Sequence, residues 1–254
     1  MRQALQTLAP SHPVQFSAVL DIDLAARVAN SLLAGAIADT LWLRSDPEQP
    51  VLFDDVARLS GDMWLALATC EAVARSGRAM TPPDMHRVLD EWRAQGRLPI
   101  SEAGLGALAI QVAPLAFVLH PDDDRDLESL QALVSAIRDD DLAYVTARAT
   151  LVAMRECLER NRPPDLAVFA ATHVLPPELT RAIALAGEHV DDLEAAIADM
   201  APPDDTRQVA CLTGLLLGAA GCEMPRALAL TTLERAAIDG VAEPFAQFVA
   251  AMAG

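Results

Sequence analysis

The chain has 254 residues, with 19 Lys and Arg against 36 Asp and Glu, so its formal net charge is −17 with histidines neutral. This length suits one large domain or two small ones, and a hydrophobic share of 52% excludes a disordered or low-complexity chain. The acidic balance argues against nucleic acid or an anionic membrane surface as a partner, because both carry negative charge and would repel the protein.

Residues 1–24 are expected to form an N-terminal extension ahead of the main domain. They lack a charged segment followed by an unbroken apolar run, so no secretory signal is expected and the predicted location is the cytoplasm. The extension has two interpretations. It is either a strap that packs on the domain or an arm that binds a partner.

The rest of the chain, residues 25–254, is predicted to be a single compact all-α domain of roughly ten helices. Apolar residues recur at helical spacing between proline and acidic breaks, and Ala and Leu dominate where a sheet protein would use β-branched residues and aromatics. Helices are expected at 85–95 and 127–138. Proline-rich breaks mark three further helix starts, at 163–165, 176–178 and 202–204.

The acidic runs at 122–124 and 139–141 are interpreted as solvated helix starts, because adjacent carboxylates point in different directions and cannot all face one ion. The five histidines are scattered without metal-ligand spacing, which argues against a zinc site.

An apolar segment at Cys211–Gly221 is predicted to be a central helix, since no face of it is polar. Gly214 and Gly218, four residues apart, would let another helix approach closely. The longest apolar run, 210–222, is shorter than the roughly 18 residues that cross a bilayer. The cysteines are predicted to be buried free thiols, and they stand at Cys70, Cys157, Cys211 and Cys222.

Four stretches follow one another in the order of a known motif set. Arg27–Trp42 is similar to R-x-x-G-x-L-x-G-x-x-x-G-D-A-L-G, and Gly61–Leu67 falls where that set has T-D-D-T-x-M-x-L-A-L. Gln111–Ala116 is similar to M-R-x-A-P-L-G, and Pro203–Gly214 to G-G-D-T-D-T-V-A-A-I-A-G. Through these stretches the chain resembles the ADP-ribosylglycohydrolases, an all-helical family in which the second and fourth motifs supply ligands to a pair of divalent metals.

Departures from these motifs fall on the metal ligands themselves. Where the family has T-D-D-T, this chain has residues 58–61, Arg-Leu-Ser-Gly. In the last motif Asp205 and Thr206 are kept, but Arg207 and Gln208 replace an acidic residue and a threonine. The glycines of the first motif are replaced by Asn30, Ala34, Ala38 and Trp42, and the arginine of the third by Gln111.

The resemblance therefore implies a site that keeps the fold and has lost the dinuclear metal chemistry, with no catalytic residue and no cofactor. The expected remnant cleft consists of Asp39, Trp42, Ser60, Gly61, Asp62, Gln111, Asp205, Thr206 and Arg207. Arg207 is expected to take the place of a cation beside Asp205, and to pair with Asp39, whose burial would otherwise be costly. The alternatives are a helix cap for Asp205 and Thr206 and a solvated surface position for Arg207.

Three functions remain open at this point. The leading one is a pseudoenzyme, that is, a catalytically silent protein that acts by binding. As an immunity or regulatory protein it would bind a protein partner, including a basic one, or it would bind an ADP-ribose-like ligand. The resemblance supplies the precedent, because some members of the family are immunity proteins against ADP-ribosyltransferase toxins. The second is an active ADP-ribosylglycohydrolase with a reduced Mg²⁺ or Mn²⁺ site at Asp39, Asp62 and Asp205. The third is a purely structural role.

Overall fold

The computed structural model describes residues 18–45, 59–77, 80–98, 104–200, 206–223 and 232–253. Every regular element in these ranges is a helix, which confirms the predicted all-α class. In chain order the helices are α1 (Ala18–Ser45), α2 (Gly61–Ser76), α3 (Pro82–Ala94), α4 (Leu105–Val112), the 3-10 helix η1 (Ala113–Phe117), α5 (Asp124–Ile137), α6 (Asp141–Arg160), α7 (Leu166–Ala170), α8 (Pro177–Glu188), α9 (Leu193–Ala198), α10 (Arg207–Ala220) and α11 (Thr232–Ala253).

The first helix, α1, crosses the predicted boundary between the extension and the main domain at residue 24. Residues 18–24 therefore continue into the main body of the protein as one helix. Residues 1–17, which make up the rest of the predicted extension, lie outside the described residues.

Side-chain caps begin the helices where the acidic runs predict helix starts. The carboxylate of Asp123 accepts the Arg125 N–H at 2.9 Å at the start of α5, and that of Asp140 accepts the Ala143 N–H at 2.7 Å at the start of α6. Asp165 caps α7 in the same way. These contacts satisfy N–H groups that have no partner within the first helical turn. The predicted break at 202–204 lies outside the described residues.

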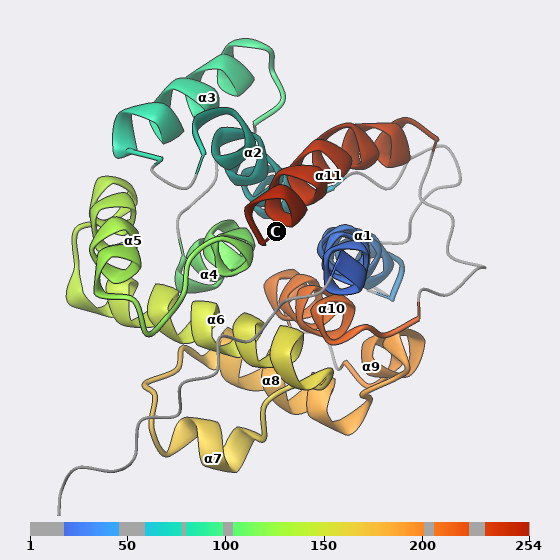
Figure 1. Cartoon of the computed structure of the whole chain (residues 1–254). Helices are drawn as coiled ribbons and strands as arrows, with labels where there is room; N and C mark the ends of the chain where they lie inside the picture. Colours follow the sequence, from blue (N-terminus) through green and yellow to red (C-terminus); the bar gives the residue numbers. More distant parts are fainter. Residues whose placement is uncertain are drawn as a thin grey trace, which may run out of the picture.

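Helix α10 lies at the centre of the fold, between α1 on one side and α6, α8 and α9 on the other (Figure 1). All its residues from Val209 to Ala220 are buried, which confirms the prediction of a central helix. Helix α1 packs closely against it at the two predicted glycines. A Cβ on Gly214 would lie 2.3 Å from the carbonyl oxygen of Ala34, and one on Gly218 would lie 2.5 Å from that of Asn30.

Arg27 ties α1 to the C-terminal ends of two neighbouring helices. Its guanidinium donates to the carbonyl oxygens of Leu158 at 2.6 Å and Cys157 at 2.8 Å in α6, and to that of Ala219 at 3.1 Å in α10. A cation at this position also offsets the partial negative charge of both helix ends.

The buried apolar side chains of the described helices form one continuous core. Helix α11 packs across α1 and α2, and α2 packs in turn against α3 and α4 (Figure 1). The four cysteines are buried free thiols within this core, as predicted. Among the described helices, none combines the length and the apolar character that crossing a membrane requires.

Candidate functional site

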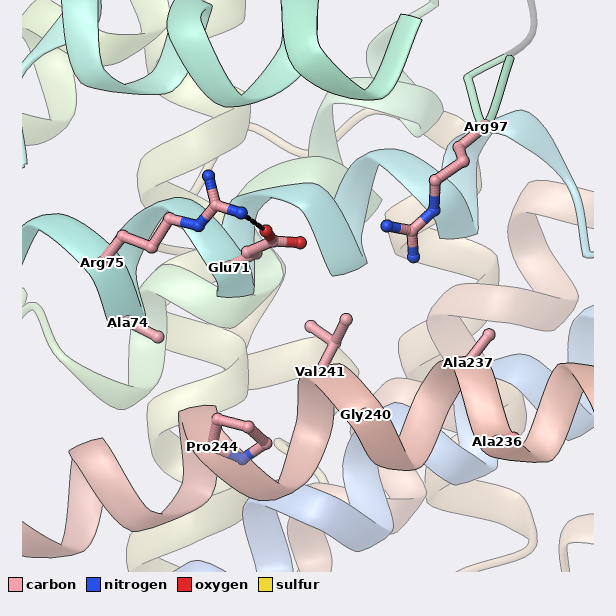
Figure 2. A pocket seen from close by; sticks show the side chains of 9 residues that line it. All are labelled: Glu71, Ala74, Arg75, Arg97, Ala236, Ala237, Gly240, Val241 and Pro244. Atoms are coloured by element: carbon pink, nitrogen blue, oxygen red, sulfur yellow. Dashed lines mark ion pairs between the residues drawn. The ribbon is translucent and has the colours of Figure 1, made fainter. Parts of the chain in front are cut away.

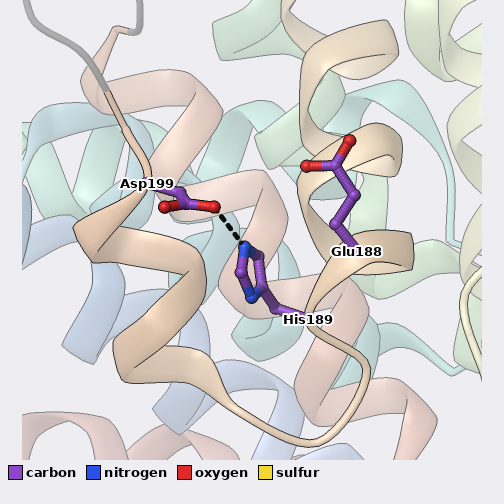
Figure 3. A group of neighbouring side chains, drawn as sticks. All are labelled: Glu188, His189 and Asp199. Carbon is purple, nitrogen blue, oxygen red and sulfur yellow. Dashed lines mark hydrogen bonds and ion pairs between the residues drawn. The ribbon is translucent and has the colours of Figure 1, made fainter.

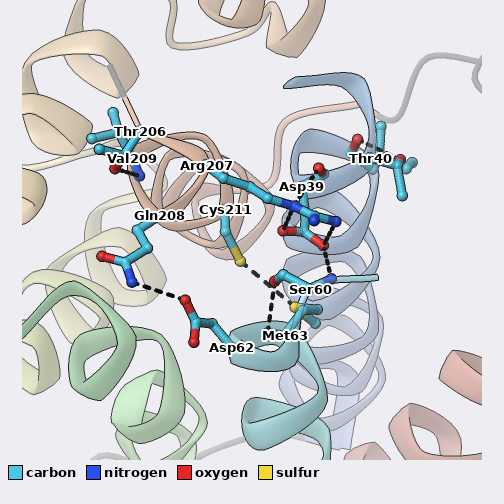
Figure 4. Close-up of polar contacts among 11 residues, drawn as sticks. Asp39, Thr40, Ser60, Asp62, Met63, Thr206, Arg207, Gln208, Val209 and Cys211 are labelled. Atoms are coloured by element: carbon cyan, nitrogen blue, oxygen red, sulfur yellow. Dashed lines mark hydrogen bonds and ion pairs between the residues drawn. The ribbon is translucent and has the colours of Figure 1, made fainter. Parts of the chain in front are cut away.

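Three segments far apart in the sequence meet at one place (Figure 4). Asp39 comes from the C-terminal half of α1, Ser60 and Asp62 from the start of α2, and Arg207 and Gln208 from the start of α10. Three of the four motif stretches singled out in the sequence therefore supply residues to one polar cluster.

Local capping places the starts of α2 and α10 at this cluster. The Ser60 hydroxyl accepts the Met63 N–H at 3.2 Å, and the Thr206 hydroxyl accepts the Val209 N–H at 3.3 Å. Each residue is extended at the N-cap and the helix follows directly. The cap predicted for Thr206 is thus confirmed. Beneath the cluster, the thiol of Cys211 contacts the sulfur of Met63 at 3.7 Å.

Asp39 and Arg207 form a bidentate ion pair at the centre of the cluster. Arg207 Nε lies 2.7 Å from Asp39 Oδ1, and Arg207 Nη2 lies 3.0 Å from Oδ2. Arg207 Nε also donates to the backbone oxygen of Asp39 at 3.1 Å. The Asp39 side chain is fully buried and that of Arg207 is 24% exposed. The predicted pairing of these two residues is confirmed, and Arg207 is not a solvated surface residue.

A third donor completes the surroundings of the carboxylate. The backbone N–H of Ser60, at the start of α2, donates to Asp39 Oδ2 at 2.6 Å. Burial raises the pKa of the Asp39 carboxyl, and the Arg207 charge and the Ser60 hydrogen bond partly offset that effect. The carboxylate is therefore costly to bury by itself and depends on its cationic partner.

Asp62 and Gln208 form a second contact beside this ion pair. Gln208 Nε2 donates to Asp62 Oδ2 at 2.9 Å. A Cβ on Gly106 at the start of α4 would lie 2.2 Å from Gln208 Oε1, so this glycine makes room for the amide. Sequence reasoning placed Asp62 in the cleft but missed its partner. The replacement of a family threonine by Gln208, next to Arg207, was the available signal.

The remaining predicted site residues are placed as follows. Gly61 is the first residue of α2 and adjoins the cluster through Ser60 and Asp62. Trp42 lies one helical turn beyond Asp39 and packs, half-buried, against the core. Gln111 is buried in α4, and no polar contact among the described residues joins it to the cluster. Asp205 lies outside the described residues, so its pairing with Arg207 stays a prediction.

As they are placed, Asp39 and Asp62 do not offer a Mg²⁺ or Mn²⁺ ion the set of oxygen ligands that it needs. Such ions need several oxygen ligands with free lone pairs, and both oxygens of Asp39 already accept hydrogen bonds. The guanidinium of Arg207 would also repel a cation placed against Asp39. One oxygen of Asp62 is held by Gln208. Among the described residues, the carboxylate of Asp39 is thus engaged in an ion pair within the protein.

A second group of ligating side chains lies at the C-terminal ends of α8 and α9 (Figure 3). Glu188, His189 and Asp199 each offer a ligand atom, and these atoms lie within 4.8 Å of one another. His189, the C-cap residue of α8, has its Nε2 2.7 Å from Oδ2 of Asp199, the C-cap residue of α9, so this contact joins the C-terminal ends of the two helices. Glu188 and Asp199 are exposed, which is the usual state of surface carboxylates.

Comparison with protein-family models, with curated proteins and with solved structures finds no match for this chain. The resemblance to the ADP-ribosylglycohydrolases therefore rests on the four sequence stretches alone.

Proposed function

We propose that this chain is a catalytically silent, ADP-ribosylglycohydrolase-like protein that acts by binding. The observation that carries the proposal is the bidentate ion pair between Asp39 and Arg207. In the family that the motifs resemble, the corresponding stretches hold divalent metals. Here the guanidinium of Arg207 supplies the positive charge beside the carboxylate in place of a metal ion. A fixed arginine neutralises a carboxylate, but it cannot present an activated water to a ribosyl linkage as a metal can.

The convergence of three motif stretches supports the resemblance. Asp39, Asp62 and Arg207 come from positions up to 168 residues apart, yet they take part in two neighbouring sets of hydrogen bonds between the starts of α2 and α10 and the C-terminal half of α1. Unrelated surface motifs would not be expected to gather in this way. The same contacts argue against the alternative, an active glycohydrolase with a reduced Mg²⁺ or Mn²⁺ site.

A protein partner is the favoured target of binding, of the immunity or regulatory type. The formal charge of −17 favours a basic partner, because opposite charges steer association and increase its rate. An ADP-ribose-like ligand is the second target. It would need space beside a cluster whose polar groups are already engaged with one another.

Metal binding and hydrolysis test the catalytic part of the proposal. Chelator-stripped protein is titrated with Mn²⁺ by calorimetry and assayed for release of ADP-ribose from ADP-ribosylated arginine. We expect neither saturable binding nor release. Arg207→Gln, with circular dichroism as a check on folding, is run beside Arg235→Gln, whose guanidinium lies on the surface of α11 and pairs with Asp239. Stoichiometric Mn²⁺ binding together with hydrolysis by the unmodified protein would overturn the proposal.

A second experiment tests the binding part. The full chain is titrated with ADP-ribose, and it is also immobilised to capture a partner that is then purified and recombined with it. We expect a complex of fixed stoichiometry that weakens as salt rises from about 50 to about 500 mM, because salt screens charges between the partners. Failure to bind ADP-ribose and failure to reconstitute any complex would together reject binding and favour the structural role.

A further inference from the structure

A cavity of about 490 Å³ lies between α2 and α11, away from the Asp39–Arg207 cluster (Figure 2). Its volume lies within the range of small-molecule sites. Two arginines line it, Arg75 from α2 and Arg97 from beyond α3, and α11 forms the opposite wall with small residues and Val241. Figure 2 shows the two guanidinium groups reaching toward each other from opposite sides of the cavity.

The two arginines differ in how their charge is compensated. Arg75 pairs with Glu71 and, at 2.6 Å, with Glu91. Glu71 in turn accepts the Trp92 indole N–H at 2.8 Å. Among the described residues no carboxylate pairs with Arg97. Glu71 also lines the cavity, but it pairs with Arg75, so Arg97 is the lining arginine without a direct carboxylate contact in the described part of the chain.

Arg97 is held in place by aromatic rings. The centre of its guanidinium lies 3.9 Å from the ring centroid of Trp92 and 5.8 Å from that of Trp64. Stacking of this kind uses the face of the guanidinium and leaves the N–H groups at its edge available. A planar, oriented fork of donors matches a carboxylate or a phosphate.

The wall formed by α11 has open space where a larger side chain could stand. A Cβ added to Gly240 would have no heavy atom within 4 Å, although a glycine inside a helix costs about 1 kcal/mol relative to alanine. Pro244, one turn later, also lines the cavity and has no N–H to donate to the carbonyl of Gly240. Two residues that weaken α11 thus both face the cavity.

We infer that this cavity binds a small organic anion. Its carboxylate or phosphate pairs with the edge of Arg97, and its apolar part lies against Val241 and the small residues of α11. The inference does not depend on the proposed function, because no residue of the cavity belongs to the Asp39–Arg207 cluster.

The test uses the full chain and matched pairs of probes. Hexanoate and benzoate are titrated beside their neutral counterparts hexanamide and benzamide, and phenyl phosphate beside inorganic phosphate. Binding is followed by calorimetry and by tryptophan fluorescence, since Trp92 and Trp64 lie against Arg97. We expect saturable binding of at least one organic anion, and weaker binding of its neutral counterpart or of phosphate alone. The carboxylate and phosphate probes decide which head group the cavity takes.

Three variants separate the cavity from the general surface. Arg97→Met keeps an apolar stem on Trp92, removes the donors and should weaken binding about tenfold to a hundredfold. Gly240→Leu should narrow the cavity and weaken binding without lowering the melting temperature, because its Cβ meets no heavy atom within 4 Å. Arg93→Met, on exposed α3 surface, should change nothing. The inference fails if no organic anion binds saturably at up to about 10 mM, or if Arg97→Met and Arg93→Met bind equally well.

Discussion

At the scale of single residues, the Asp39–Arg207 pair is the feature with the largest expected energetic effect. Removing one partner of a buried ion pair leaves the other charge without compensation, at a cost of about 3–5 kcal/mol. We therefore expect Arg207→Met to lower the free energy of unfolding by that amount, measured by chemical denaturation at neutral pH. The double variant Asp39→Asn, Arg207→Met should recover much of the loss, because no buried charge remains.

The same variant has an expected dependence on pH. Burial already raises the pKa of Asp39, and without Arg207 the folded-state pKa rises further above the unfolded value of about 3.9. Between these two pKa values the folded state binds more protons than the unfolded state, so stability falls as pH rises. The deficit of Arg207→Met relative to the unmodified protein should therefore grow as pH rises from about 4 toward neutral. A deficit that is constant across this range would contradict the prediction.

The residue scale also shows how far sequence reasoning reaches. The Asp39–Arg207 pair was predictable because a carboxylate inside an apolar helix needs a partner, and the motif resemblance put Arg207 nearby. The Asp62–Gln208 contact was not predicted, because an amide beside a partly exposed carboxylate meets no comparable need. Strong energetic requirements are visible in a sequence, and optional hydrogen bonds are not.

At the scale of helices, the contact between α1 and α10 depends on the absence of a side chain. In Gly214→Ala the new methyl would lie 2.3 Å from the Ala34 carbonyl oxygen, so the two helices must move apart. We expect a loss of about 1–3 kcal/mol or more, measured by thermal and chemical unfolding. Gly187→Ala in α8, where nothing lies within 4 Å, is the matched control and should stabilise by about 0.5–1 kcal/mol. Equal effects at the two positions would rule out close packing as the reason for Gly214.

Arg27 allows a second prediction at this scale, since it joins three helices through backbone carbonyls. A lysine keeps the charge but cannot reach acceptors in both α6 and α10 with one planar fork. Arg27→Lys should therefore cost about 1–3 kcal/mol, measured by chemical denaturation. Arg148→Lys, on the exposed face of α6, should stay within about 0.5 kcal/mol of the unmodified protein. A neutral effect of Arg27→Lys would show that the tie contributes little.

Helix starts were the most predictable elements because their signals are local. Asp123 and Asp140 stand directly before the N–H groups that they cap, and both capped helices were predicted from that pattern. The tie made by Arg27 was not predicted, because its acceptors lie 130 or more residues away and are backbone atoms without a sequence signature.

At the scale of the whole molecule, one continuous core connects the described helices, and the four cysteines report on it. Burial raises the pKa of the thiols of Cys70, Cys157 and Cys211, which disfavours the reactive thiolate. We expect these three to react with a thiol reagent only when the core opens, at rates that fall together as stability rises. Burial raises the pKa of the Cys222 thiol as well, but this residue lies beyond the C-cap of α10, where opening needs the least unfolding, so it should react first. Rapid labelling of Cys211 in the folded protein would contradict a single cooperative core.

Sequence reasoning reached the fold class and the central helix, because periodicity and apolar content determine both. It did not reach the cavity between α2 and α11. No sequence motif marks the lining residues Arg97, Gly240 and Pro244. They come together at one cavity only when the helices pack. A cavity whose lining residues come from distant segments, and which folding does not require, produces no sequence pattern from which it can be predicted.

The ion pair between Asp39 and Arg207 also constrains how this protein can change over generations. A substitution at either position alone passes through a form with a lone buried charge, and that form is at a selective disadvantage. The two positions are therefore expected to covary among homologous proteins, so that a homologue carries both side chains or neither. Homologues that keep only the arginine or only the aspartate, opposite a neutral residue, should be rare.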